Sequence, residues 1–188
     1  MNSELEQLVR QKLQERRNSR TFKIEYEGET LWVKTPEMGE ANGWHLLLTF
    51  FAKLLNNNFL IPTVVRDPKA SLAYEAQKIM KLSAHQIAVP ELVLADEEFL
   101  VLKDAGRALS SLLNNEELPF EEKRLICEKL SQELANMHNR GFYHSRPALR
   151  DIACKEGKIT FMDFEENLEE TLSDEEAIIR DGLIYVHA

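Results

Sequence analysis

One segment of the chain, residues 141–164 (GFYHSRPALRDIACKEGKITFMDF), constrains the fold and the chemistry more than any other. A polar loop begins at His144 and contains Asp151, a strand-like run (KITFM) follows, and Asp163-Phe164 ends the segment. This order places one carboxylate before a short strand and a second carboxylate directly after it. Carboxylates are hard oxygen ligands, and two at this separation can flank a divalent cation. The segment therefore predicts a polar loop followed by a hairpin, with two acidic groups placed to flank one or two metal ions.

The charge balance limits the classes of partner. The 188-residue chain carries 23 basic and 32 acidic residues, a formal net charge of −9. A general nucleic-acid or anionic-membrane binder gains affinity from a basic face, so this composition argues against both. Basic residues do gather near the N-terminus, at Arg10, Lys12, Arg16, Arg17 and Arg20. We interpret them as the solvated face of a helix of mixed charge, with a local basic patch as the alternative.

Length, cysteine content and the N-terminus point to a cytoplasmic protein. With 44% hydrophobic residues, the chain can bury one substantial core or two small lobes that share a cleft. The N-terminal MNSELE lacks the features of an export signal, and Cys127 and Cys154 are expected to be free thiols. The longest apolar run, residues 45–55 (HLLLTFFAKLL), is too short to span a bilayer. It predicts a helix over 44–56 that covers the protein's own sheet, docks a partner or touches a membrane surface.

The spacing of apolar residues predicts an α+β protein. Alternation on both sides of a Glu-Gly-Glu turn predicts a β-hairpin over 21–33, and ELVLA followed by FLVLK predicts a second hairpin at 91–103. Helical spacing predicts helices over 3–17 and 71–82, and a long helix from Pro119 to Gly141. Ser173 and Glu176 form a capping-box pattern, which predicts a terminal helix from residue 174. Strands early and helices late are typical of α+β folds.

The segment 141–164 resembles the catalytic segment of the protein-kinase-like superfamily, in which a His-x-Asp-x-x-x-x-Asn loop precedes a strand and Asp-Phe-Gly. The stretch from Tyr74 to Leu92 is similar to small bacterial members, the Kdo and heptose kinases of lipopolysaccharide assembly, and to RIO-type kinases. The resemblance covers most of residues 20–188 and implies a two-lobe fold. A small, mainly β N-lobe would comprise residues 1–104, and a reduced helical C-lobe would comprise residues 105–188.

This resemblance implies a nucleotide site. Lys34, at the end of the first hairpin, would hold the α/β-phosphates of ATP, and Glu75 would be its ion-pair partner. The backbone of Lys103, Asp104 and Ala105, in the stretch FLVLKDAG, would read the adenine edge. The first hairpin departs from the family pattern, because EYEGETLW contains one glycine and offers no glycine-rich loop.

The resemblance also implies a catalytic set formed by His144, Arg146 and Asp151, with Asp151 and Asp163 as ligands of Mg²⁺. Asp181 would brace the backbone of the catalytic loop. Two positions differ from the family pattern: Arg146 stands where the catalytic Asp belongs, and Asp151 stands where the Asn belongs. An arginine cannot accept a proton at any accessible pH, so the general base is missing.

Two functions therefore stay open. The first is an ATP- and Mg²⁺-binding kinase that transfers phosphate to a small-molecule, sugar-lipid or protein hydroxyl, which Lys34, Glu75 and Asp163 favour. The alternative is a pseudokinase that binds a nucleotide or a partner without turnover, which Arg146 favours. A third interpretation is an unrelated α+β domain with chance motif matches. The large lobe of a full protein kinase would continue beyond residue 188, so we expect a minimal or shortened C-lobe.

Overall fold

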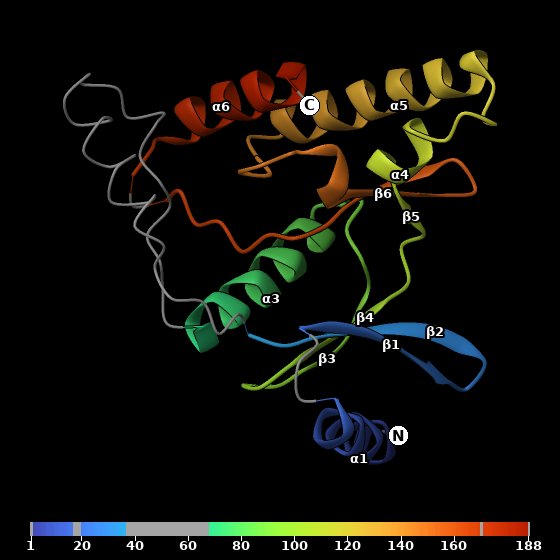
Figure 1. Cartoon of the computed structure of the whole chain (residues 1–188). Coiled ribbons are helices and arrows are strands. Elements are labelled where there is room, and N and C mark those ends of the chain that lie inside the picture. The colour runs from blue at the N-terminus through green and yellow to red at the C-terminus, as the bar shows by residue number, and fades with distance from the viewer. Residues whose placement is uncertain (1, 17–19, 37–67, 170, 188) are drawn as a thin grey trace, which may run out of the picture.

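A computed structural model describes residues 2–16, 20–36, 68–169 and 171–187, and these ranges form an α+β structure (Figure 1). The helix expected at 44–56 lies outside the described residues. The helices are α1 (Asn2–Glu15), α3 (Pro68–Ala84), α4 (Leu109–Leu113), α5 (Phe120–Asn139) and α6 (Asp174–His187), with a 3-10 turn, η2 (Leu149–Asp151). The strands are β1 (Thr21–Tyr26), β2 (Glu29–Lys34), β3 (Leu92–Ala95), β4 (Leu100–Lys103), β5 (Arg107–Ala108), β6 (Ile152–Lys155) and β7 (Lys158–Phe161).

The first four strands form one antiparallel sheet in the order β1-β2-β4-β3. Phe22 and Ile24 of β1 and Leu31 and Val33 of β2 alternate with more exposed residues and face α1, where they form a buried apolar core. Helix α3 lies on the other side of the sheet (Figure 1), where Leu72 and its neighbours pack against β4. The sheet is therefore covered by a helix on each face, and Lys34 ends β2 on the side of α3.

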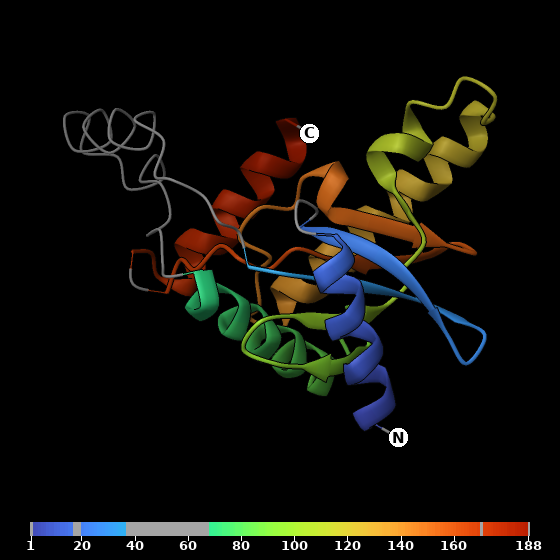
Figure 2. The ribbon, with the colours of Figure 1, turned by 60° about the horizontal axis from the view of Figure 1, so that its bottom comes forward.

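A second antiparallel sheet, β5-β6-β7, lies with α4, α5 and α6 in the other part of the molecule (Figure 2). Its hairpin turns at Glu156-Gly157, and both residues have positive φ, as a type I′ turn requires. The larger apolar core joins this sheet to α5 and to the C-terminal half of α3, through Ile79 and Leu82. Helix α3 thus contributes side chains to the cores on both sides of the cavity described below.

The elements expected from the sequence are present in the described ranges, with different ends. Helix α3 begins earlier than expected, at Pro68, a residue that suits the first turn because its missing N–H is not needed there. Helix α6 begins with the expected capping box: Ser173 N donates to Glu176 Oε2 (2.9 Å), and Glu176 N donates to Ser173 Oγ (3.3 Å). The short elements β5, α4 and η2 were not expected, because runs of two to five residues carry no readable period.

Of the basic residues near the N-terminus, those on α1 form part of a helix face of mixed charge, whereas Arg20 lies outside the helix and pairs with Glu165. Arg10 forms ion pairs with Glu6 on α1 and with Asp96 and Glu98 in the β3–β4 turn. Within the described residues, no helix is long and apolar enough to cross a membrane.

Candidate functional site

A cavity of about 420 Å³ lies between the four-stranded sheet, α3 and the β6–β7 hairpin. Among its lining residues are apolar groups from β4 and β5, the connection between those strands, and a set of charged side chains. The charged residues that line it are Arg20, Lys34, Glu75, Lys103, Arg150, Asp151 and Asp163. The cavity therefore brings together residues from distant parts of the chain that the sequence predicts as site residues.

Lys34 lies at the centre of the charged part of this cavity. Its Nζ is 2.8 Å from Glu75 Oε1, 2.7 Å from Asp163 Oδ1 and 2.8 Å from Glu165 Oε1. Neighbouring Val33 faces α1, so the alternation of the strand turns Lys34 toward α3. Only 8% of Lys34 is exposed to solvent, and its ammonium is held by three carboxylates from two segments, α3 and the chain after β7. The ion pair expected between Lys34 and Glu75 is present.

Glu75 is the most deeply buried of these carboxylates, with 1% of its surface exposed. Besides Lys34, it accepts a hydrogen bond from the backbone N–H of Phe164 (3.3 Å). Burial raises the pKa of Glu75, and the charge of Lys34 opposes that rise. Glu75 thus couples α3 both to β2 and to the chain that follows β7.

Arg146 also lies among three carboxylates, one of which, Asp163, it shares with Lys34. Its Nε is 3.1 Å from Asp151 Oδ2, its Nη2 is 3.0 Å from Asp163 Oδ2, and its Nη1 is 3.2 Å from Glu166 Oε1. Burial opposes the ionisation of Asp163, but Lys34 and Arg146 outweigh it, so the pKa of Asp163 is lowered. Burial dominates at Asp151 and raises its pKa, although Arg146 acts against the rise. The guanidinium therefore bridges the two carboxylates that the sequence predicts as metal ligands.

Helix α6 fixes the loop that carries Arg146. Asp181 is fully buried, and its two oxygens accept hydrogen bonds from the backbone N–H groups of His144 (2.6 Å) and Ser145 (2.9 Å). The brace expected from Asp181 is thus present as a contact. These bonds hold Ser145 at a φ of 93°, a backbone conformation that non-glycine residues rarely adopt.

His144 itself packs inside the protein. It is 1% exposed, its ring lies 4.7 Å from that of Phe164, and its Nδ1 accepts a hydrogen bond from Arg146 N (3.3 Å). Burial lowers the pKa of His144 to about 4. His144 is not among the residues that line the cavity, so its geometry suits a packing and orienting role.

Lys78 connects α3 to the same loop. Its Nζ donates to His144 O (3.1 Å) and to Ser145 Oγ (2.9 Å), and it lies over the ring of Tyr143 (4.6 Å to the centroid). Burial lowers the pKa of Lys78 to about 8. Because Glu75 lies one turn earlier on α3, this helix contacts both Lys34 and the loop of Arg146.

The connection from β4 to β5 offers few free backbone groups. The N–H of Lys103 donates to Glu91 O (2.9 Å), and the N–H of Asp104 donates to Thr30 O (3.2 Å). The Asp104 side chain accepts from Trp32 Nε1 (2.8 Å) and does not line the cavity. Among the described residues, the N–H and C=O of Ala105 have no hydrogen-bond partner. The backbone groups of Ala105 are therefore available to a ligand in the cavity.

Gly106 lets this connection pass close to β6. Its φ is +99°, and a Cβ at this position would lie 2.5 Å from the carbonyl oxygen of Cys154. Any larger residue would displace the connection or the strand, so the position requires glycine.

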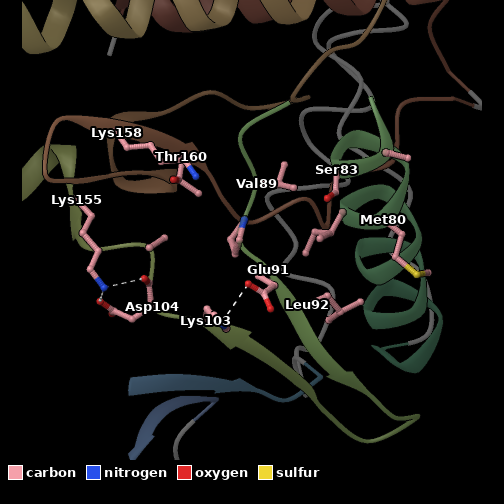
Figure 3. Close-up of a pocket in the computed structure, with 14 residues that line it drawn as sticks. Met80, Ser83, Val89, Glu91, Leu92, Lys103, Asp104, Lys155, Lys158 and Thr160 are labelled. Atoms are coloured by element: carbon pink, nitrogen blue, oxygen red, sulfur yellow. Dashed lines mark hydrogen bonds and ion pairs between the residues drawn. The ribbon is translucent and has the colours of Figure 1, made fainter. Parts of the chain in front are cut away.

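A second cavity, of about 710 Å³, shares Pro90, Lys103 and Ala105 with the first and extends to α3 and the β6–β7 hairpin. Figure 3 shows Lys155 facing Asp104 and Lys103 facing Glu91 in this cavity, and the corresponding charged atoms lie 3.6 and 3.3 Å apart. It contains none of the buried carboxylates described above. We therefore place the candidate site in the smaller cavity, where the cations and buried carboxylates meet.

The carboxylates expected to bind Mg²⁺ already form ion pairs with cations of the chain. Both oxygens of Asp163 are bonded, one to Lys34 and one to Arg146, and Asp151 is bonded to Arg146. A second carboxylate group, Glu75, Asp163 and Glu165, has ligand atoms within 4.8 Å of one another, but the ammonium of Lys34 contacts all three residues. In this arrangement the residues do not fit a divalent cation, and Mg²⁺ at Asp151 and Asp163 stays a prediction.

Two carboxylates of the site, Glu165 and Glu166, were not expected from the sequence. Glu165 binds Lys34 and Arg20, and Glu166 binds Arg146 and Arg180. A signal was present, because Glu165 follows Asp163-Phe164 at the position where the resembled pattern has glycine. A carboxylate at this position could have indicated an additional ion-pair partner for Lys34.

Comparison with known proteins gives distant similarities. No family model matches the chain. The chain is 29% identical over 185 residues to an uncharacterized protein of Haemophilus influenzae, a match that covers 98% of this chain and 69% of that protein. It is 26% identical over 114 residues to the KEOPS complex subunit Bud32 of Pyrococcus abyssi. That match covers 58% of this chain and about half, 51%, of Bud32.

Proposed function

We propose that this chain is a kinase-like protein of two lobes that binds ATP in the cavity between them. The observation that carries the proposal is the contact of Lys34 with both Glu75 and Asp163 inside one cavity. The distant similarity to Bud32, a kinase-like subunit, supports the same class. On this proposal the N-lobe comprises residues 1–104 and the C-lobe comprises residues 105–188, joined by the connection at Ala105.

The lining of the cavity suits a nucleoside triphosphate. Four cationic residues line it, and each can contact an anionic ligand by exchanging a carboxylate that now pairs with it. Lys34 would exchange its contact with Asp163 for a phosphate oxygen while it keeps Glu75. The adenine would lie against the apolar residues of β4 and β5 and bond to the free backbone groups of Ala105. Phosphates and base would thus be held at opposite ends of one cavity.

Two outcomes follow once ATP is bound, and the chemistry of the loop separates them. Transfer of phosphate to the hydroxyl of a small molecule, a sugar-lipid or a protein needs a carboxylate that accepts the proton. Arg146 cannot do so, and the carboxylate beside it in the loop is Asp151, whose pKa is raised by burial. The alternative is a binding module without turnover, and the contacts of Arg146 with Asp151 and Asp163 favour it.

A thermal-shift and calorimetric titration with ATP tests the proposal. Ligand that binds only the folded state stabilises it by about 2.7 kcal/mol at a hundredfold excess over the Kd, so the midpoint rises with ATP concentration. We expect Lys34→Met to weaken ATP binding by about tenfold or more, because it removes the phosphate contact.

Lys155→Met is the matched control. Lys155 lines the larger cavity and not the smaller one, so this variant should bind ATP as the wild type does. Loss of binding in Lys155→Met with retention in Lys34→Met would move the nucleotide to the larger cavity and contradict the proposal.

A further inference from the structure

Every carboxylate that could hold a metal in this site is bonded to a cation of the chain. Arg146 contributes one nitrogen to each of three carboxylates, those of Asp151, Asp163 and Glu166, at 3.0–3.2 Å. Lys34 contacts the remaining group, Glu75 and Glu165, and shares Asp163 with Arg146. The acidic groups of the site are thus partly neutralised before any ion from solution arrives.

The guanidinium is well suited to this position. It is planar, carries its charge at any accessible pH, and presents its donors in a fixed fork. Asp181 accepts hydrogen bonds from the backbone N–H groups of His144 and Ser145. Lys78 donates hydrogen bonds to His144 O and Ser145 Oγ, so the loop is held from two helices. The position of Arg146 is therefore set by the backbone as well as by its own ion pairs.

We propose that Arg146 acts as a tethered cation that takes the place of a divalent metal ion between Asp151 and Asp163. This inference rests on the proposed nucleotide function and adds to it how the nucleotide is bound. A divalent cation and the guanidinium compete for the same oxygens, so wild-type protein binds free metal weakly. ATP is then held by the protein's own cations, and its affinity depends little on Mg²⁺.

The charges that line the cavity agree with metal-independent binding of an anion. Arg20, Lys34, Lys103 and Arg150 outnumber the lining carboxylates Glu75, Asp151 and Asp163. Arg146 also forms ion pairs with two of these carboxylates, Asp151 and Asp163. The phosphates of ATP would contact these lining cations without a bridging ion, in place of carboxylates that now pair with them, such as Glu165 beside Arg20 and Lys34.

The first arm of the test uses metal alone. Mn²⁺ is titrated into the full chain while the free ion is followed by electron paramagnetic resonance, for wild type and Arg146→Gln. An opposite charge at this distance changes the proton affinity of a carboxylate by about 10- to 1000-fold, so we expect Arg146→Gln to bind Mn²⁺ about tenfold or more tightly than wild type. The control is Arg124→Gln, which removes an arginine from the exposed surface of α5 and should leave Mn²⁺ binding unchanged.

The second arm uses wild-type protein and needs no variant. ATP is titrated by calorimetry in EDTA and in Mg²⁺, and the two Kd values of the wild type should agree within about threefold. In Arg146→Gln, Mg²⁺ should lower the Kd for ATP by about tenfold or more. If Arg146→Gln does not fold, Arg146→Lys replaces it, because it keeps the charge but loses the fork and should bind Mn²⁺ more tightly than wild type.

The outcomes distinguish the inference about Arg146 from the proposed nucleotide function. Equal Mn²⁺ affinity of wild type and the Arg146 variants would overturn the inference, as would wild-type ATP binding that Mg²⁺ strengthens tenfold. In that case the nucleotide function would still stand. Absence of ATP binding in both buffers would overturn the proposed function, and the Mn²⁺ titration would still decide whether Arg146 excludes a metal.

Discussion

Lys34 Nζ lies 2.7 Å from Asp163 Oδ1, although the two residues are 129 positions apart in the sequence. The same ammonium group lies 2.8 Å from Glu75, so one side chain joins β2, α3 and the chain after β7. The apolar residues of β2 belong to one packing cluster, whereas α3 and the chain after β7 share another, and Lys34 lies where these segments meet. The stability of the site should therefore depend on which member of this group is removed.

Lys34→Met should destabilise the protein more than Glu75→Gln. Removing the lysine leaves Glu75 buried without its counter-charge, and breaking a buried pair in this way costs about 3–5 kcal/mol. In Glu75→Gln the lysine keeps Asp163 and Glu165, and the new amide can still accept from Phe164 N, so we expect a cost of about 1–2 kcal/mol. Urea unfolding of the two variants measures the difference, and equal costs would show that Lys34 is not the main counter-charge of Glu75.

Asp181→Asn should destabilise the protein by about 3 kcal/mol, because each hydrogen bond to a charged group contributes about 1.5–3 kcal/mol. The carboxylate accepts from the N–H groups of both His144 and Ser145, and an asparagine offers only one acceptor oxygen. Asp174→Asn, in the exposed first turn of the same helix, is the control and should cost less than about 1 kcal/mol. Chemical denaturation compares them; similar small effects would mean that the loop keeps its conformation without Asp181.

His144 predicts a specific pH dependence of stability. Its pKa is lowered to about 4 in the folded protein and is near 6.5 when unfolded, so the folded state binds fewer protons between these values. Stability from this group is complete above pH 6.5 and is lost as the pH falls toward 4. From pH 7 to pH 4.5, wild type should lose about 2–3 kcal/mol more than His144→Phe, which cannot titrate.

The control for this pH dependence is His187→Gln, at the exposed end of α6, which should follow the wild-type curve. The measurement is the free energy of unfolding in urea at several pH values. If wild type and His144→Phe show parallel curves, the histidine is not held neutral by its burial.

The sequence predicted those features that depend on neighbours along the chain. The hairpin at Glu27-Gly28 and the capping box at Ser173 follow from local turn and cap chemistry, and both are present. The contact of Lys34 with Glu75 was expected from the order of motifs in the resemblance. These are the cases in which residue type and spacing carry the structural information.

The remaining contacts depend on packing between distant segments. Nothing in the spacing of Lys78 indicates that it reaches His144 and Ser145, 66 and 67 positions later. The orientation of Asp104, away from the smaller cavity and toward Trp32, likewise follows from how the connection crosses the sheet. The ion pair between Glu166 and Arg146 was not expected, because only the folded loop brings the two residues together.

Arg146→Asp tests whether the missing carboxylate separates this protein from an active kinase. The variant supplies a proton acceptor where the resembled pattern has one, and general-base help is worth about 10²–10⁴-fold in rate. It also removes the cation beside Asp151 and Asp163 and adds a like charge, so the variant should be less stable in EDTA and regain stability with Mg²⁺. With ATP and Mg²⁺ present, we expect ATP hydrolysis or phosphate transfer above the wild-type rate.

Arg146→Asn separates the two effects of that substitution. It removes the cation without supplying a base, so it should gain Mg²⁺ binding but no turnover. Phosphate release from ATP, measured for wild type, Arg146→Asp and Arg146→Asn, gives the comparison. A wild type that turns over ATP robustly, and loses this activity in both variants, would make Arg146 a catalytic residue that clamps a phosphate. The binding-module alternative would then be wrong, because the arginine, and not an absent aspartate, would support the reaction.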